Sequence, residues 1–161
     1  MIHNKRAYVA RFGGVYEHSP WVAEKAFDMG PPAPEALPAV MRQIVENAGH
    51  EAQLALLRAH PDLAGKLAKS GALTNESTSE QASAGLDQCT DEEFAAFTEL
   101  NNRYKARFGF PYILAVRGRH RTEILENFKS RVDNAPEVEF REALNQVHQI
   151  AALRFEALFA G

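Results

Sequence analysis

The sequence predicts an all-α fold, a single domain of about seven or eight helices. Apolar residues recur at helical spacing in several separate stretches, most clearly between Glu35 and Ala48. Before some of these stretches, a Ser or Thr precedes an acidic residue by three positions, which is typical of a helix start. Only Phe110–Val116 could form a β-strand, and no stretch elsewhere alternates as a partner strand would. We therefore expect that segment to be a buried connector.

Composition limits the classes of protein to consider. A chain of 161 residues fits one domain, which we expect to span residues 1–161. Its net charge of −3 gives no reason to expect a nucleic-acid partner, and no apolar run approaches the roughly 20 residues of a membrane span. The single Cys89 cannot form an internal disulfide, and the first twenty residues lack the apolar core of a signal peptide. A cytoplasmic location is the expectation.

The first sixty residues contain clear signals for helix ends. Gly13 should stop a first short helix, and Ser19 with Pro20 reads as an N-cap followed by proline at the first helical position. Gly49 should end the amphipathic stretch before it. The helices expected in this half cover about 4–12, 20–29, 35–48 and 51–59.

The second half begins after Pro61 with a short helical piece. Ser77 and Glu80 have the spacing of a capping box, so we expect a helix to begin at Ser77. Thr90 and Glu93 form a second such pair, before a helix that should close at Gly109. The remaining expected helices cover 62–71, 122–132 and 137–159.

His60 is the first candidate for chemistry. Because it precedes Pro61, it is disfavoured in the α region, so the helix before it should stop there. The imidazole would then lie at a helix terminus. The residues alone leave two interpretations open: a charged cap on the helix C-terminus, or a catalytic acid or base.

Two other features could bind a ligand. The expected helix start at Ser77 would offer N–H groups and a positive dipole end to an anionic or carbonyl-rich ligand, although Glu80 could equally be only a capping-box acid. Arg154 is flanked by apolar residues, so it either snorkels from a core face or clamps an anion. An extended, unpaired backbone at 112–116 could bind a planar ring through its N–H and C=O groups.

Several short motifs occur in order along the chain. They are Ser19-Pro20-Trp21, His60-Pro61-Asp62-Leu63, Ser77-x-x-Glu80-Gln81, Phe108-Gly109-Phe110-Pro111 and the helix from Gln146 to Arg154. Together they cover nearly the whole chain, and they resemble the OHCU decarboxylase family. That family acts on 2-oxo-4-hydroxy-4-carboxy-5-ureidoimidazoline (OHCU) in urate catabolism.

The resemblance implies a cofactor-free decarboxylase that forms (S)-allantoin from this small molecule, with no metal and with a possible homodimer. It implies that His60 is the catalytic acid or base. It assigns substrate binding to Pro61, Ser77, Thr78, Ser79, Glu80, Gln81, Tyr112, Ile113, Leu114, Ala115, Val116 and Arg154.

Two alternatives remain at this point. The chain could be a non-catalytic helical binding module that holds a partner helix in a groove lined by Phe94, Phe97 and Tyr104. It could also be a metal-free ureide hydrolase of the same pathway, which would release no CO2.

Overall fold

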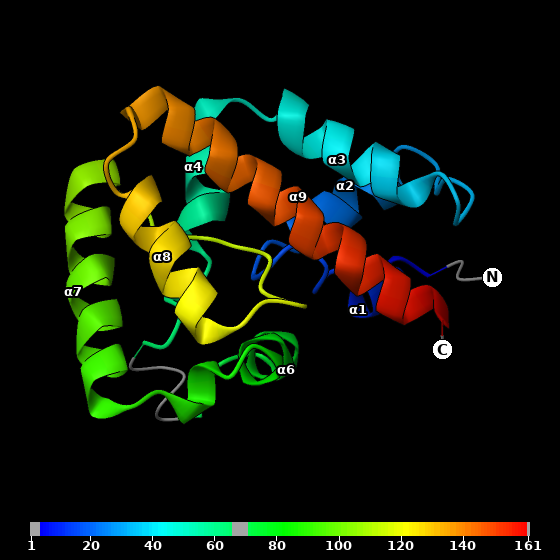
Figure 1. Ribbon diagram of the computed structural model, residues 1–161. Coiled ribbons are helices and arrows are strands. Elements are labelled where there is room, and N and C mark those ends of the chain that lie inside the picture. The colour runs from blue at the N-terminus through cyan, green and yellow to red at the C-terminus, as the bar shows by residue number, and fades with distance from the viewer. Residues whose placement is uncertain (1–3, 66–70, 161) are drawn as a thin grey trace. The chain divides into compact units, whose positions relative to one another are not determined.

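The chain is all-α, as the sequence predicts. The computed structural model describes residues 4–65 and 71–160, and within those ranges it contains eight α-helices, one short 3-10 helix and no strand (Figure 1). The helices are α1 Lys5–Phe12, α2 Trp21–Asp28, α3 Leu37–Asn47, α4 His50–Arg58, α6 Asn75–Ser83, η1 Leu86–Gln88, α7 Asp91–Phe108, α8 Arg121–Arg131 and α9 Pro136–Ala160.

The helices group into two compact units. Unit 1 is Met1–His60 together with Val147–Gly161, and unit 2 is Pro61–Gln146. One boundary therefore falls directly after His60, and the other falls inside α9. A single domain spanning residues 1–161 stays a prediction.

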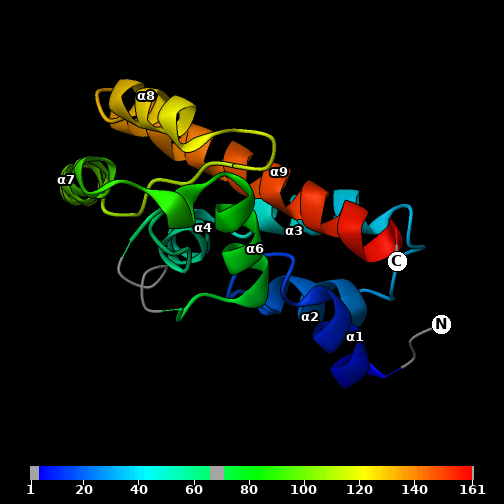
Figure 2. The ribbon, with the colours of Figure 1, turned by 60° about the horizontal axis from the view of Figure 1, so that its bottom comes forward.

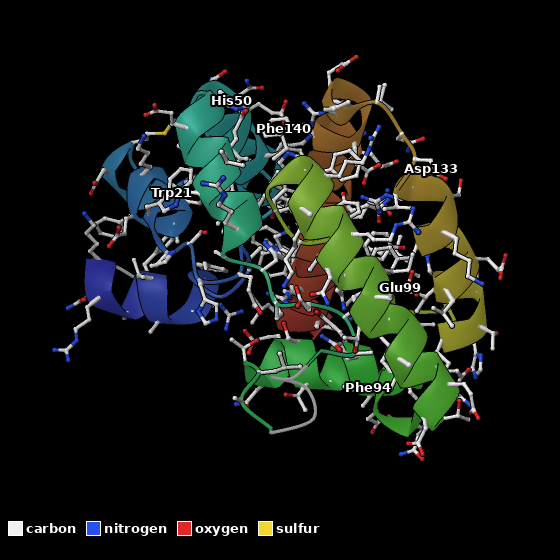
Figure 3. All side chains as sticks on the ribbon, turned by 90° about the vertical axis from the view of Figure 1, so that its left-hand side faces the viewer. Trp21, His50, Phe94, Glu99, Asp133 and Phe140 are labelled. Atoms are coloured by element: carbon white, nitrogen blue, oxygen red, sulfur yellow. The ribbon has the colours of Figure 1, made fainter. Side chains whose placement is uncertain are left out.

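Unit 1 is built on helices α1 to α4, which follow one another in blue to cyan in Figures 1 and 2. Asn4 caps α1 by accepting a hydrogen bond from the Ala7 N–H. Helix α1 packs against α2, α2 against α3, and α3 against α4. Trp21, at the start of α2 (Figure 3), is half-buried, and the Lys25 ammonium lies 5.7 Å from its ring centroid.

The α9 segment of unit 1 is tied to the rest of the unit by long-range contacts. The ring of Phe12 lies 6.3 Å from that of Phe155. Buried His148 joins two further groups: its Nδ1 is 2.9 Å from the Tyr16 hydroxyl, and its Nε2 is 2.8 Å from a Glu46 carboxylate oxygen. These contacts hold the C-terminal half of α9, which also carries Arg154, to the rest of unit 1.

In unit 2, helices α7 and α8 pack against each other (Figure 1). Thr90 and Glu93 form the predicted capping box at the start of α7, and Glu93 directly precedes the Phe94 labelled in Figure 3. Phe97 and Tyr104 are fully buried and pack against Phe128 of α8. Of the three rings that the binding-module alternative requires for its groove, Phe97 and Tyr104 thus lie in the core, whereas Phe94 is half-buried.

The connector after α7 is buried and has no regular structure, as predicted. Residues 111–116 form neither helix nor strand, and all are buried. The Tyr112 ring stacks on Phe128 at 3.8 Å between centroids. The Arg131 guanidinium lies 4.6 Å from the centroid of the Tyr112 ring. Arg131 also donates to the Ile113 carbonyl at 2.6 Å and pairs with buried Glu139 at 2.6 Å.

Several predicted helix starts were wrong by one or two residues. The N-cap of α2 is Pro20 instead of Ser19, whose hydroxyl donates to the Glu17 carbonyl. Helix α8 begins at Arg121 instead of Thr122, because His120 and Glu123 form its capping box. The amphipathic helix begins at Leu37 instead of Glu35. Of the predicted helix 62–71, residues 62–65 are not helical, with a turn at 63–64, and 66–70 lie outside the described residues.

Candidate functional site

His60 lies where the sequence predicts it, directly after the C-terminal turn of α4. Helix α4 ends at Arg58 with Ala59 as its C-cap. The His60 side chain is 9% exposed, and its Nδ1 is 3.0 Å from the Leu56 carbonyl oxygen. A carbonyl oxygen can only accept, so Nδ1 carries the hydrogen of the neutral ring. The lone pair of that ring is therefore on Nε2.

The charge state of His60 follows from its burial. Burial away from water is the main reason that the pKa of His60 is lowered to about 4. The charges of Arg154 and His18 also lower this pKa, whereas the hydrogen bond to Leu56 and the charge of Glu17 raise it. The ring is consequently neutral near pH 7. The low pKa speaks against a charged helix cap, and the imidazole caps α4 by its hydrogen bond to the Leu56 carbonyl instead.

Arg154 is buried in an ion pair. Its Nη1 donates to the Gly14 carbonyl at 2.8 Å and to a Glu17 carboxylate oxygen at 3.1 Å. Arg154 is 6% exposed and Glu17 is 2% exposed. The interpretation as an exposed snorkelling residue is therefore wrong. The guanidinium holds an anion, but that anion belongs to the same chain.

The predicted capping box of Ser77 and Glu80 was wrong. Helix α6 begins at Asn75, and its N-cap is Thr74, whose side chain accepts a hydrogen bond from the Ser77 N–H. Ser77 is thus inside the first turn and buried, whereas Thr78 and Ser79 are exposed. Glu80 is half-buried and lies one turn beyond the helix start, so the argument from N-terminal N–H groups does not apply to it.

Gln81 has a role that the sequence did not reveal. Its Oε1 accepts from the Ala64 N–H at 3.0 Å, and its Nε2 donates to the Asp62 carbonyl at 3.3 Å. The side chain therefore holds the turn that follows Pro61. Ala64 in this turn has a φ of +52°, which is uncommon for a residue other than glycine. Buried Asn101 donates to the Leu63 carbonyl at 3.1 Å and fixes the same turn.

Some backbone N–H and C=O groups of the connector are hydrogen-bonded within unit 2, and others are not. Ala115 donates its N–H to the Gln146 side chain at 3.0 Å, and the Ile113 carbonyl accepts from Arg131. By contrast, the N–H and C=O groups of Leu114 have no hydrogen-bond partner among the described residues. Buried backbone groups are normally paired, so unpaired ones are candidates to bind a ligand.

Within unit 1, Arg154 contacts Glu17, and the charges of Arg154, Glu17 and His18 act on the pKa of His60. Within unit 2, it places Gln81 against the backbone turn next to Pro61 and holds the connector 112–116 on α8 and α9. The sequence did not single out Glu17, although it lies two residues before the Ser19-Pro20-Trp21 motif. That proximity was the available signal.

Other kinds of site have little basis in the described residues. No group of three His, Cys, Asp or Glu side chains that could hold a metal ion occurs there. No helix of that part of the chain is both long and apolar enough to cross a membrane. A cavity of about 770 Å³ in unit 1, which Tyr8, Phe12 and Phe159 help to line, includes none of the predicted site residues.

Comparison with known proteins assigns the chain to a family. The model of the OHCU decarboxylase family matches residues 3–156. The chain belongs to the OHCU decarboxylase family. A relative from Haloferax volcanii, named 2-oxo-4-hydroxy-4-carboxy-5-ureidoimidazoline decarboxylase, is 43% identical over 96% of this chain and 90% of its own length. A mouse relative of the same name is 34% identical over 94% of this chain and 85% of its own length.

Solved structures of similar proteins share the fold. The crystal structure of an OHCU decarboxylase in the presence of (S)-allantoin matches 98% of this chain and 99% of its own, with a TM-score of 0.75 and 25% identity. The crystal structure of (S)-allantoin synthase matches with a TM-score of 0.74 and 33% identity. That match covers 96% of this chain but only 50% of the synthase chain.

Proposed function

We propose that this chain decarboxylates OHCU to (S)-allantoin in urate degradation and that it requires no cofactor. Membership of the OHCU decarboxylase family supports the substrate and the reaction. The structural observation that carries the proposed mechanism is His60, a buried neutral imidazole whose Nδ1–H is bound to the Leu56 carbonyl.

The substrate itself explains why no cofactor is needed. Its carboxylate is attached to a carbon next to a ring C=N bond. When the C–C bond to the carboxylate breaks, CO2 leaves and the bonding electrons move toward the C=N group, giving an ene-type intermediate. One proton must then reach one face of that intermediate. The protein has to orient the carboxylate, stabilise the developing charge and control that proton.

His60 is proposed as the group that handles the proton. With its lone pair on Nε2, it abstracts the substrate hydroxyl proton, and the resulting imidazolium can return a proton to the intermediate. The low pKa of His60 keeps it in the base form before reaction. It also makes the imidazolium a strong proton donor, which favours the second transfer.

The remaining roles are proposed from the family resemblance. Arg154 would bind the substrate carboxylate, for which a planar guanidinium is suited. Pro61, Ser77, Thr78, Ser79, Glu80 and Gln81, with residues 112–116, would bind the ring and the ureido group. The two unpaired backbone groups of Leu114 favour a role in pairing with an amide-rich ring. For Gln81, the bonds to Asp62 and Ala64 favour a role in shaping the turn beside Pro61.

The deciding experiment is coupled turnover. OHCU is unstable, so it is generated in situ, the protein is added, and circular dichroism follows the formation of one-handed allantoin. Release of CO2 together with (S)-allantoin is the expected result. Allantoin formation no faster and no more one-handed than without protein would refute decarboxylation, and a ring-opened product without CO2 would favour the hydrolase instead.

A cytoplasmic location and a homodimer are further proposals. They are supported by the single cysteine and the resemblance to the family, respectively. Sedimentation analysis of the purified protein tests the dimer, and fractionation of cells that express it tests the location.

A further inference from the structure

Glu17 is a buried carboxylate to which neither the sequence motifs nor the proposed mechanism gave a role. It lies in the loop between α1 and α2 and is 2% exposed. Burying a carboxylate is costly unless a cation compensates it, and here Arg154 supplies that cation at 3.1 Å. A buried pair of this kind contributes little to stability compared with apolar packing, so its retention calls for another explanation.

The loop that carries Glu17 is rigidly held. The Ser19 hydroxyl donates to the Glu17 carbonyl at 3.1 Å, and the Ser19 N–H donates to the Tyr16 carbonyl at 3.0 Å. His18 has a φ of +49°, a backbone conformation that residues other than glycine rarely adopt. Strained backbone of this kind persists only where its surroundings fix it, and it is concentrated at functional sites.

The pair acts on the proposed catalytic group. The charges that influence the His60 imidazole come from Glu17 and His18 in the loop and from Arg154 on α9, and the Leu56 carbonyl of α4 binds its Nδ1. The two bonds from Arg154 Nη1, to the Gly14 carbonyl and to the Glu17 carboxylate, fix the orientation of the guanidinium plane. The loop between α1 and α2 therefore fixes the position of the Arg154 guanidinium of α9, whose charge acts on His60.

We propose that Glu17 is a positioning residue, which holds the Arg154 guanidinium in the orientation that binds the substrate carboxylate near His60. The inference rests on the proposed function of His60 and Arg154. It assigns Glu17 no contact with the substrate. A carboxylate rather than an amide is needed because it neutralises Arg154 before substrate arrives and makes the bond from Arg154 Nη1 to Glu17 a charge-assisted one.

A double-mutant cycle tests this role. The variants are Glu17→Gln, which keeps the shape but removes the charge, Arg154→Met, and the double variant, each measured for kcat and KM by coupled turnover. We expect Glu17→Gln to raise KM on the order of 10-fold, since misplacing a binding group by a fraction of an ångström is costly. In the Arg154→Met background the same change should have no further effect, because Glu17 acts through Arg154.

Glu46→Gln is the matched control. Glu46 also pairs across unit 1 to a residue of α9, His148, but it is not among the groups that act on His60. It should lower stability and leave KM unchanged. An unchanged KM in Glu17→Gln, or an equal rise in KM in both backgrounds, would overturn the inference. If Glu17→Gln does not fold, Glu17→Asp, which keeps the charge but shortens the side chain, takes its place in the cycle: it should raise KM when Arg154 is present and have no further effect in the Arg154→Met background.

These outcomes are separate from a failure of the proposed function. If the wild-type protein forms no one-handed allantoin, the reaction itself is wrong, whatever Glu17 does. If the wild type is active and only the cycle fails, the error lies in the role given to Glu17.

Discussion

The Nδ1 of His60 lies 3.0 Å from the carbonyl oxygen of Leu56, four residues earlier in the chain. This contact decides the tautomer, since a carbonyl accepts a hydrogen bond and cannot donate one. It also shows why the proline after His60 matters. Because the helix stops there, the ring folds back onto the last turn of α4 and leaves Nε2 outside that hydrogen bond.

Replacement of His60 should remove catalysis without removing the fold. His60→Asn and His60→Ala are expected to lower kcat on the order of 10²-fold or more, the usual weight of a general acid–base group. The measurement is the rate of one-handed allantoin formation by circular dichroism. Because Asn keeps a donor for the Leu56 carbonyl, its melting temperature should stay closer to that of the wild type. Undiminished stereospecific turnover in either variant would rule out this role for His60.

His60 should also make stability depend on pH. Its folded pKa, about 4, is below the value of 6.5 for an exposed histidine, so between these pH values the unfolded chain binds more protons. The free energy of unfolding should therefore fall as pH decreases from about 6.5 to about 4, by on the order of 3 kcal/mol. Urea titrations across this range measure it. In His60→Asn the part of the slope due to this group should vanish, and an identical slope in both proteins would contradict the assignment.

Gln81 should be important for stability as well as for activity. Gln81→Ala removes the partners of the Ala64 N–H and the Asp62 carbonyl, and leaving a buried group unpaired costs about 1–3 kcal/mol. Urea unfolding should show a loss of this size. Ser83→Ala on the same helix is the control: Ser83 is exposed and donates only to the Glu80 carbonyl, so its stability should change by less than about 0.5 kcal/mol. Equal, small effects of both changes would show that Gln81 does not hold the turn.

The ion pair between Arg131 and Glu139 should be essential for unit 2. Both side chains are buried, and Arg131 also binds the connector at Ile113. Glu139→Gln leaves a buried guanidinium without its counter-charge, which is expected to cost about 3–5 kcal/mol. The comparison is Glu126→Gln, whose partner Lys129 is exposed and whose loss should cost less than about 1 kcal/mol. Thermal melts that rank the two variants the other way would contradict this view.

Replacement of Tyr8 should not lower the stability of the protein, in contrast to the changes above. Its ring is buried, and its hydroxyl has no hydrogen-bond partner among the described residues. Burial also raises the pKa of the Tyr8 phenol. Tyr8→Phe removes an unsatisfied polar group and keeps the ring contact with Phe12, so stability should be unchanged or higher by up to about 1 kcal/mol. A clear loss of stability in urea unfolding would show that the hydroxyl has a partner in solution.

Local patterns predicted most of the fold, and long-range contacts could not be predicted. The α7 capping box at Thr90 was confirmed because all its signals lie within four residues. Thr74 and Ser77 are both suitable caps, and only the tertiary burial of Ser77 decides between them. The pairing of Arg154 with Glu17 joins residues 137 positions apart. No periodicity in the sequence reports a contact of that separation.

The composition of unit 1 from two distant segments also affects how the protein is made. The ribosome synthesises residues up to His60 long before the α9 segment that completes the unit. Until that segment emerges, Glu17 lacks its counter-ion and Phe12 lacks the ring of Phe155. A nascent chain would thus expose these groups for several seconds at ordinary translation rates. Shielding by a chaperone during synthesis would benefit unit 1 more than the contiguous unit 2.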